Sequence, residues 1–254
     1  MAPELNAIEV GLLAFACLFG GALLGMRLRN ALPHHHLSGD SAKLLELGLA
    51  IVGTMAGLVL GLLVASATSA YNAQRSELLD VSSKIVVLDR TLKHYGPEAY
   101  PARAALRVAV ERTLYRIWPR ESSGAPELDP SAEGADAVID QIEELSARDD
   151  AQRSLKSAAI GLALSLAEIR WLMYEQTGSS LSVPLLVLLI FWFTITFVGF
   201  GVFSPPNPTV VVALALCSLA VSGAIFVMLE MYTPFEGLVQ IPSAPLREAL
   251  AHLH

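Results

Sequence analysis

Four apolar runs dominate this sequence, and each is long enough to cross a lipid bilayer. A membrane-spanning helix needs about 20 mostly apolar residues, and runs of that kind cover residues 7–26, 47–70, 183–203 and 209–229. The stretch Pro205-Pro206-Asn207-Pro208 separates the last two runs. Because proline cannot continue a helix, we expect these two runs to form a tight helical hairpin.

The overall composition agrees with a membrane protein. Only 16% of the 254 residues are charged, whereas soluble domains carry about 25%. The formal net charge of −7 argues against nucleic acid as a partner, because phosphates require a basic surface. Cys17 and Cys217 both lie in apolar runs, so they predict neither a disulfide framework nor a zinc site.

The first apolar run differs from a cleavable signal peptide. Its leader, residues 1–6, contains no Lys or Arg, and the run itself is longer than such a signal requires. We therefore expect residues 7–26 to form a retained membrane helix.

Residues 71–180 hold most of the charge and predict a helical soluble domain. Apolar residues recur there every seven positions, which is typical of a coiled-coil-like seam. The first seam contains Tyr71, Leu78, Ile85 and Leu92 together with Gln74, Val81, Leu88 and Tyr95. It predicts one unbroken helix from the second apolar run to Gly96-Pro97. Further helices are expected at about 98–118, 135–148 and 151–176, the last with a second seam of Leu155, Ala159, Leu162, Leu166, Ile169 and Met173.

These patterns predict an all-α integral membrane protein with four transmembrane helices. A helical soluble domain, residues 71–180, is inserted between the second and third of them. An N-terminal helix pair (1–70) precedes this domain, and a C-terminal hairpin (181–230) and a tail (231–254) follow it.

The orientation in the membrane rests on positive charges near helix ends, which are enriched on the cytoplasmic side. One side carries Arg27, Arg29 and Lys43; the other carries Arg75, Lys84, Arg90, Arg170 and Arg247. The larger set favours a cytoplasmic soluble domain.

Small residues recur every four positions in the second apolar run. Gly53, Gly57 and Gly61 would allow a neighbouring helix to approach closely, as small residues do in membranes. A second interpretation is that this helix lines a pore. Its three/four spacing then gives a narrow, mildly polar and uncharged pore face of Thr54, Leu58, Gly61, Ala65 and Thr68. Both interpretations hold together in a ring of subunits, and such a pore would select by dehydration or close by a hydrophobic constriction.

Two groups of titratable residues are candidates for sensing pH or ions. His34, His35, His36 and Asp40 lie between the first two apolar runs, and histidine titrates near neutral pH. Consecutive histidines rarely converge on one ion, so we predict no metal site. Glu230, at the end of the fourth run, is either a pathway residue or a marker of the membrane interface.

Several segments resemble a known family. They are Leu32 to Ser41, Gly53 to Ala65, Leu88-Asp89-Arg90, Tyr95 to Glu98, Asn207 to Val210, Gly223 to Phe226, Pro234 to Gly237 and Ser243 to Arg247. This ordered set resembles the bacterial bestrophin-like membrane proteins of the DUF4239 family.

The resemblance implies a pentamer in the bacterial inner membrane, with cytoplasmic termini and an ion pathway lined by the second helix. Two departures affect what it implies about ions. Tyr232 stands where many relatives are expected to have an acid, and the second helix lacks the aromatic residues of bestrophin pores. Anion selectivity is therefore not implied.

Three functions compete at this stage. The leading hypothesis is a homo-oligomeric ion channel that conducts inorganic ions, needs no cofactor and is not an enzyme. The alternative is a stator-like or scaffold protein acting with a partner subunit, since flagellar stators also place a large segment between membrane helices two and three. The third is a membrane enzyme using the loop from His34 to Asp40, although the chain has no GxSxG, HExxH, Walker or GxGxxG motif.

Overall fold

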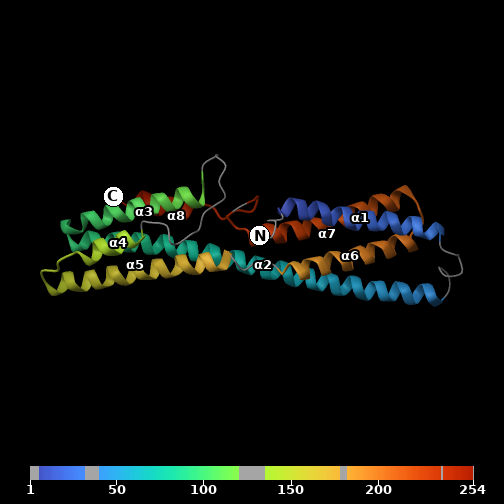
Figure 1. The fold of residues 1–254 in the computed structure, drawn as a ribbon, viewed down its shortest axis with the longest axis horizontal. Coiled ribbons are helices and arrows are strands. Elements are labelled where there is room, and N and C mark those ends of the chain that lie inside the picture. Colours follow the sequence, from blue (N-terminus) through green and yellow to red (C-terminus); the bar gives the residue numbers. More distant parts are fainter. Residues whose placement is uncertain (1–5, 32–39, 120–134, 178–181, 236, 254) are drawn as a thin grey trace. The chain divides into compact units, whose positions relative to one another are not determined.

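A computed structural model of the chain describes residues 6–31, 40–119, 135–177, 182–235 and 237–253. Throughout these ranges the regular structure is helical, which confirms the predicted all-α class. Figure 1 shows the helices in chain order. They are α1 (Ala7–Ala31), α2 (Asp40–Tyr95), the short 3-10 helix η2 (Pro97–Ala99), α3 (Tyr100–Ile117), α4 (Ala135–Glu143), α5 (Asp150–Thr177), α6 (Val183–Phe203), α7 (Pro208–Tyr232) and α8 (Ala244–His252).

Four of these helices, α1, α2, α6 and α7, are long and apolar enough to cross a membrane. They coincide with the four predicted apolar runs, and the chain is a membrane protein. Helix α2 is unbroken over 56 residues, as its two sequence patterns predict together. It ends before Gly96, whose φ of 128° lies in a region that only glycine adopts readily, and Pro97 follows.

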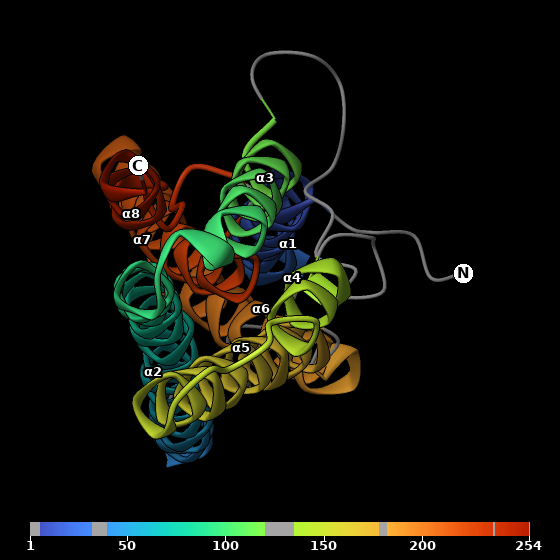
Figure 2. The ribbon, with the colours of Figure 1, turned by 90° about the vertical axis from the view of Figure 1, so that its left-hand side faces the viewer.

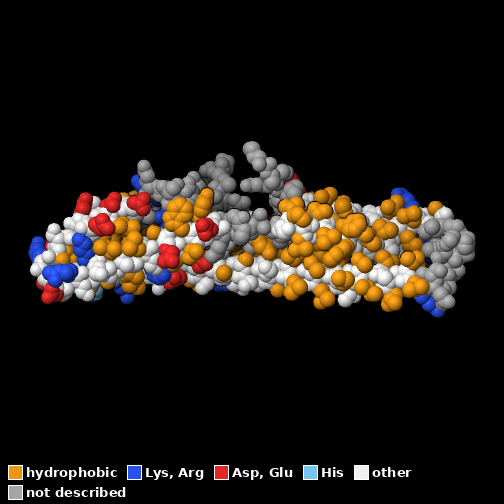
Figure 3. Space-filling view, turned by 60° about the horizontal axis from the view of Figure 1, so that its bottom comes forward, with side chains coloured by type: hydrophobic (Ala, Val, Ile, Leu, Met, Phe, Trp, Pro, Cys, Tyr) orange, Lys and Arg blue, Asp and Glu red, His pale blue; other side chains and the backbone are white. Residues whose placement is uncertain are grey.

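Contacts divide the chain into two compact units. Unit 1 contains residues 1–70 and 180–232, and unit 2 contains residues 71–179 and 233–254. Figure 3 shows hydrophobic side chains spread over the surface of unit 1, whereas acidic and basic side chains are interspersed over unit 2.

In unit 1, neighbouring contacts fix the direction of each helix. Gly21 and Gly25 of α1 face Thr194 and Val198 of α6, so α1 and α6 are parallel. The apolar half of α2 is antiparallel to α6, since Leu49 meets Gly199 and Gly53 meets Thr196. Helix α7 turns back from α6 through a short connection (Figure 1). Residue 70 of α2, the start of α6 and the end of α7 therefore lie at the same end of unit 1.

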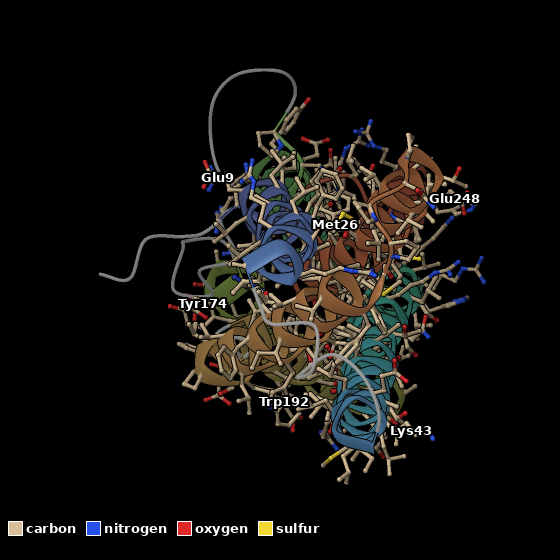
Figure 4. The ribbon with its side chains drawn as sticks, turned by 90° about the vertical axis from the view of Figure 1, so that its right-hand side faces the viewer. Glu9, Met26, Lys43, Tyr174, Trp192 and Glu248 are labelled. Carbon is tan, nitrogen blue, oxygen red and sulfur yellow. The ribbon has the colours of Figure 1, made fainter. Side chains whose placement is uncertain are left out.

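The closest helix contact in unit 1 joins α1 to α6 through glycine. A Cβ atom at Gly25 would collide with the carbonyl oxygen of Val198, and one at Gly201 would collide with the carbonyl oxygen of Ala22. Such backbone-to-backbone contact requires residues without side chains. Met26, labelled in Figure 4, is buried in the same cluster as Ala22.

Unit 2 buries the predicted heptad face of α2 inside the chain. Leu78, Ile85, Leu88 and Leu92 are all at most 5% exposed and pack with residues of α3, α4, α5 and α8. In Figure 2 these five helices surround a common interior. The seam on α5 has the same role, because Ala159 and Met173 are buried within unit 2.

An ion pair between the half-buried Arg103 and the buried Asp89 joins α3 to α2. Arg103 donates from Nε to Oδ1 of Asp89 at 2.7 Å and from Nη2 to Oδ2 at 3.1 Å. The two side chains are 16% and 7% exposed. The hydrogen bond to Asp89 and its negative charge raise the pKa of Arg103 above its ordinary value, against the opposing effect of burial.

The residues that follow α7 form part of the unit 2 core. Phe235 packs edge-on against Trp118, with ring centroids 5.8 Å apart, and the Trp118 indole N–H donates to the carbonyl of Ile241 at 3.1 Å. Leu246 and Ala249 of α8 are buried in the same core as α3.

Helix α4 is shorter than the 135–148 predicted. Its end is stabilised by Lys156 of α5, whose ammonium donates to the carbonyl oxygens of Glu143 and Leu145 at 2.7 and 2.8 Å. A cation at this position satisfies carbonyl groups that the helix leaves unpaired.

The glycine contact predicts an asymmetric response to alanine. Gly25→Ala and Gly201→Ala should each destabilise unit 1 by about 1–3 kcal/mol, because the backbones must separate to admit a methyl group. Gly20→Ala is the matched control on the same helix, since nothing lies within 4 Å of its added Cβ, and it should be neutral or slightly stabilising. Thermal unfolding in detergent, followed by circular dichroism, measures all three; equal midpoints would contradict the assigned contact.

The ion pair predicts a second contrast. Asp89→Asn should destabilise the protein by about 1–3 kcal/mol, because it weakens the charge-assisted hydrogen bonds between the two side chains. Asp80→Asn removes the partner of Lys84 in a pair whose side chains are 52% and 28% exposed, and it should cost at most about 1 kcal/mol. Unfolding midpoints of the two variants, measured side by side, test the difference; a similar small loss in both would show that the Asp89 pair is not structurally important.

Candidate functional site

The apolar half of α2 is covered on one face only. Ala56 and Ala67 are fully buried in the core of unit 1, and a Cβ at Gly53 would lie 3.2 Å from Cγ2 of Thr196. Near the end of this half, the Thr68 hydroxyl lies 3.5 Å from Sδ of Met231 on α7. Gly53, Ala56 and Ala67 are three and eleven residues apart, close to one and three helical turns, so they lie on a single face of α2.

Four of the five predicted pore residues lie away from that covered face. Thr54, Leu58, Gly61 and Ala65 are exposed in the single chain, and Thr68 is half-buried at the edge. The hydroxyl groups of Thr54 and Thr68 donate to the carbonyl oxygens of Ala50 and Val64, at 2.7 and 2.8 Å. Because the protons are directed to the helix, the hydroxyl oxygens remain available as acceptors.

The exposed surface of α2 has two flanks of different character. The first is small and mildly polar and contains Thr54, Gly57, Gly61 and Ala65. The second is bulky and apolar and contains Ile51, Met55 and Leu62, which are 52–71% exposed. Within unit 1 as described, nothing lies within 4 Å of a Cβ built at Gly57 or Gly61. Of the three predicted packing glycines, Gly53 therefore packs against another described helix of unit 1, whereas Gly57 and Gly61 have no such neighbour among the described residues.

The predicted ion-sensing residues are only partly visible. His34, His35 and His36 lie outside the described residues, and Asp40 begins α2 with a side chain that is also outside them. Among the described residues, no three His, Cys, Asp or Glu side chains gather as metal ligands would. Lys43, labelled in Figure 4, is exposed near the start of α2.

Glu230 is buried, at 3% exposure, and interacts with other groups of the chain. The same turn of α7 contains Tyr232, where an acid is expected in relatives. Its hydroxyl group lies 3.5 Å from the Ser66 hydroxyl of α2. The end of α7 thus meets α2 through neutral contacts from Met231 and Tyr232.

Sequence reasoning placed the small-residue contact on the second helix and missed the stronger one on the first. Gly21 and Gly25 of α1 have the i, i+4 spacing that brings membrane helices together, and this spacing is visible in the sequence. The repeat from Gly53 to Gly61 is longer and is therefore the clearer signal in the sequence.

The chemistry available on the α2 face is that of an uncharged surface. From Leu47 to Ala70 the helix carries no ionisable side chain, so the face offers hydroxyl oxygens, backbone dipoles and hydrocarbon. An aqueous path beside it would present low-field oxygen ligands and one constriction of the hydrophobic type at Leu58.

Comparison with known proteins gives one match. A model of the Bestrophin-like domain matches residues 16–246. No curated protein and no solved structure matches. Because the matched region includes most of α1, all of α2, α6 and α7, and most of unit 2, the chain belongs to the Bestrophin-like domain family.

Proposed function

We propose that this protein is a homo-oligomeric ion channel in which the small-residue flank of α2 lines the pore. The observation that carries the proposal is the poor cover of α2 inside one chain. Only 11% of its most apolar stretch is buried, against 22–39% in the other three apolar helices. Additional copies of the chain would cover this helix, and the family match is to a domain called Bestrophin-like.

The two flanks of α2 suit a ring of identical subunits. The small flank, with Thr54, Gly61 and Ala65, would face the axis, because only small side chains leave room for an ion. The bulky flank, with Ile51, Met55 and Leu62, would pack against the next subunit or lipid. Gly57 lies between the axis and the covered face, where it allows close approach of a neighbour. The proposed assembly is a pentamer.

Ion passage along this flank would depend on partial dehydration. The Thr54 and Thr68 hydroxyl oxygens can each replace part of a hydration shell, whereas Leu58 cannot. Leu58 is 65% exposed in the single chain, so a ring of these side chains would form a hydrophobic gate.

The membrane topology proposed here follows from the directions of the helices in unit 1. Residue 70, the start of α6 and the end of α7 share one end of unit 1, so residues 71–179 and 233–254 would emerge on one side of a membrane. The soluble domain is thus inserted between the second and third membrane helices. The Lys and Arg distribution favours the cytoplasmic side of a bacterial inner membrane for it.

The pore assignment predicts which cysteines alter conductance. In a background with Cys17 and Cys217 replaced by serine, Thr54→Cys and Ala65→Cys should lose most of their current when a charged thiosulfonate reagent reacts with them, because a charge and added bulk enter the pore. Val187→Cys on α6 is the matched control, since Val187 is 60% exposed on a helix with no proposed pore role. Planar-bilayer recording under a salt gradient measures the current and its reversal potential.

Two outcomes would contradict this proposal. Equal block at Ala65 and Val187 would remove α2 as the pore helix. A silent bilayer, from protein that native mass spectrometry finds as a single 27.1 kDa chain, would remove the channel itself.

The topology predicts a sidedness pattern for labelling. In the same cysteine-free background, Asp149→Cys and Glu248→Cys should react with a membrane-impermeant maleimide only after the cells are opened, whereas Ser38→Cys should react in intact cells. Gel-shift analysis of the labelled protein reads out each site. If Asp149 and Glu248 lay on opposite sides, the inserted-domain arrangement would be wrong.

A further inference from the structure

The helices of unit 2 line a partly open cavity that the proposed channel does not use. Its volume is about 110 Å³, and its walls come mainly from α2, α3 and α5, with one residue each from α4 and α8. All of its lining residues belong to unit 2.

Hydrocarbon lines most of this cavity. Leu88, Leu106 and Leu246 are at most 4% exposed, and they line it together with Val138, Ala163 and other apolar residues. An unfilled space of this kind forfeits the dispersion contacts of its walls, so it is expected to be either compressed or occupied. Apolar surface of this kind favours uptake of an apolar molecule, because binding removes that surface from water.

The polar lining is confined to one end of the cavity. Two cross-helix bonds fix the register: Lys84 Nζ to Ser165 Oγ at 2.7 Å, and Arg103 Nε to Asp89 Oδ1 at 2.7 Å. Helix α5 is antiparallel to α2, because Gln152 near its start reaches the Tyr95 carbonyl at the end of α2. Helix α3 is antiparallel as well, because it begins shortly after α2 ends and Arg103 reaches back to Asp89. Counting along the helices from these bonds places Arg116 and Arg170 at the level of Leu78.

The opposite end lies about 15 Å away. Leu88 is ten residues beyond Leu78, and a helix rises about 1.5 Å per residue. At that level the lining is entirely apolar. Thr113, one turn before Arg116, supplies a hydroxyl group near the charged end. The cavity therefore has an elongated hydrocarbon part and a single cationic end.

The charge of that end selects the class of ligand. The lining contains two guanidinium groups and no acidic side chain. Arg116 and Arg170 each interact with other groups of the chain, but a guanidinium carries five N–H donors, so each can add a carboxylate oxygen. Arginine matches a planar carboxylate better than lysine does, because it donates two parallel hydrogen bonds.

We infer that this cavity binds an amphipathic carboxylate with a single unbranched hydrocarbon chain. The chain extends between α2, α3 and α5 toward Leu88, and the carboxylate is held by Arg116 and Arg170. The small volume admits one narrow chain and excludes a two-chain lipid. The site does not depend on whether α2 lines a pore.

The test is binding of octanoate to the full-length protein in lipid nanodiscs, measured by equilibrium dialysis with empty nanodiscs as the blank. Saturable binding is expected, and Arg116→Gln or Arg170→Gln should weaken it by about tenfold or more, as the loss of a charge-assisted hydrogen bond does. Ala163→Phe should abolish it by filling the space. Arg112→Gln, an exposed arginine of α3 outside the lining, is the matched control and should bind octanoate as the wild type does.

Binding of octanol or octyltrimethylammonium as tight as that of octanoate would overturn the inference, because the two arginines would then not distinguish a carboxylate from a neutral or cationic head group. Absence of saturable binding above the blank would overturn it as well, as would an equal loss in the Arg112 and Arg116 variants. If Ala163→Phe fails to fold by circular dichroism, Ala109→Leu fills the same cavity from α3. Channel activity enters none of these readouts, so failure here and failure of the channel proposal are distinguishable.

Discussion

The structure of unit 1 depends on one constraint: in a bilayer, the hydrophobic effect provides no driving force for membrane helices to associate. Lipid tails are as apolar as the side chains themselves, so packing contacts must hold the helices together. The glycine contact between α1 and α6 supplies them, because Gly25 and Gly201 bring two backbones together without intervening side chains. The antiparallel packing of α2 on α6, through Gly53 and Thr196, builds on that pair.

A different rule governs unit 2, and α2 follows both rules along one helix. Its first part has small residues every four positions, whereas the part beginning at Tyr71 has large apolar residues every seven. Burial of these large apolar residues stabilises the fold, and Leu88 and Leu92 in the core of unit 2 have almost no exposed surface. The Arg103–Asp89 pair then fixes the register of α3 on α2, a specificity that hydrocarbon packing alone lacks.

The sequence predicted those features that depend on local pattern. Apolar runs and heptads need no knowledge of neighbours, so all four membrane helices and the buried face of α2 were predictable. The role of residues 233–254 was not, because Phe235 and Ile241 bury themselves against Trp118, more than a hundred positions away. The end of α4 depends similarly on Lys156 of another helix. For the candidate site, the pattern identified the residues of one face, but local pattern does not determine what that face contacts.

The number of subunits in the proposed ring decides what the α2 face can do. Packed helices lie about 8–10 Å apart, and each is about 10 Å wide with its side chains. Two or three such helices leave no space at the axis. Five leave an opening of about 2–3.5 Å in radius, which Leu58 would narrow and Gly61 would widen, since a glycine exposes the backbone itself. An ion passing Leu58 would lose water without gaining a ligand, and one turn later it would meet open space at Gly61. The neighbouring positions on that flank are too small to close the path, so Leu58 alone decides whether the pore is open. A small rotation of α2, which moves the Leu58 side chain toward or away from the axis, is therefore enough to gate the pore.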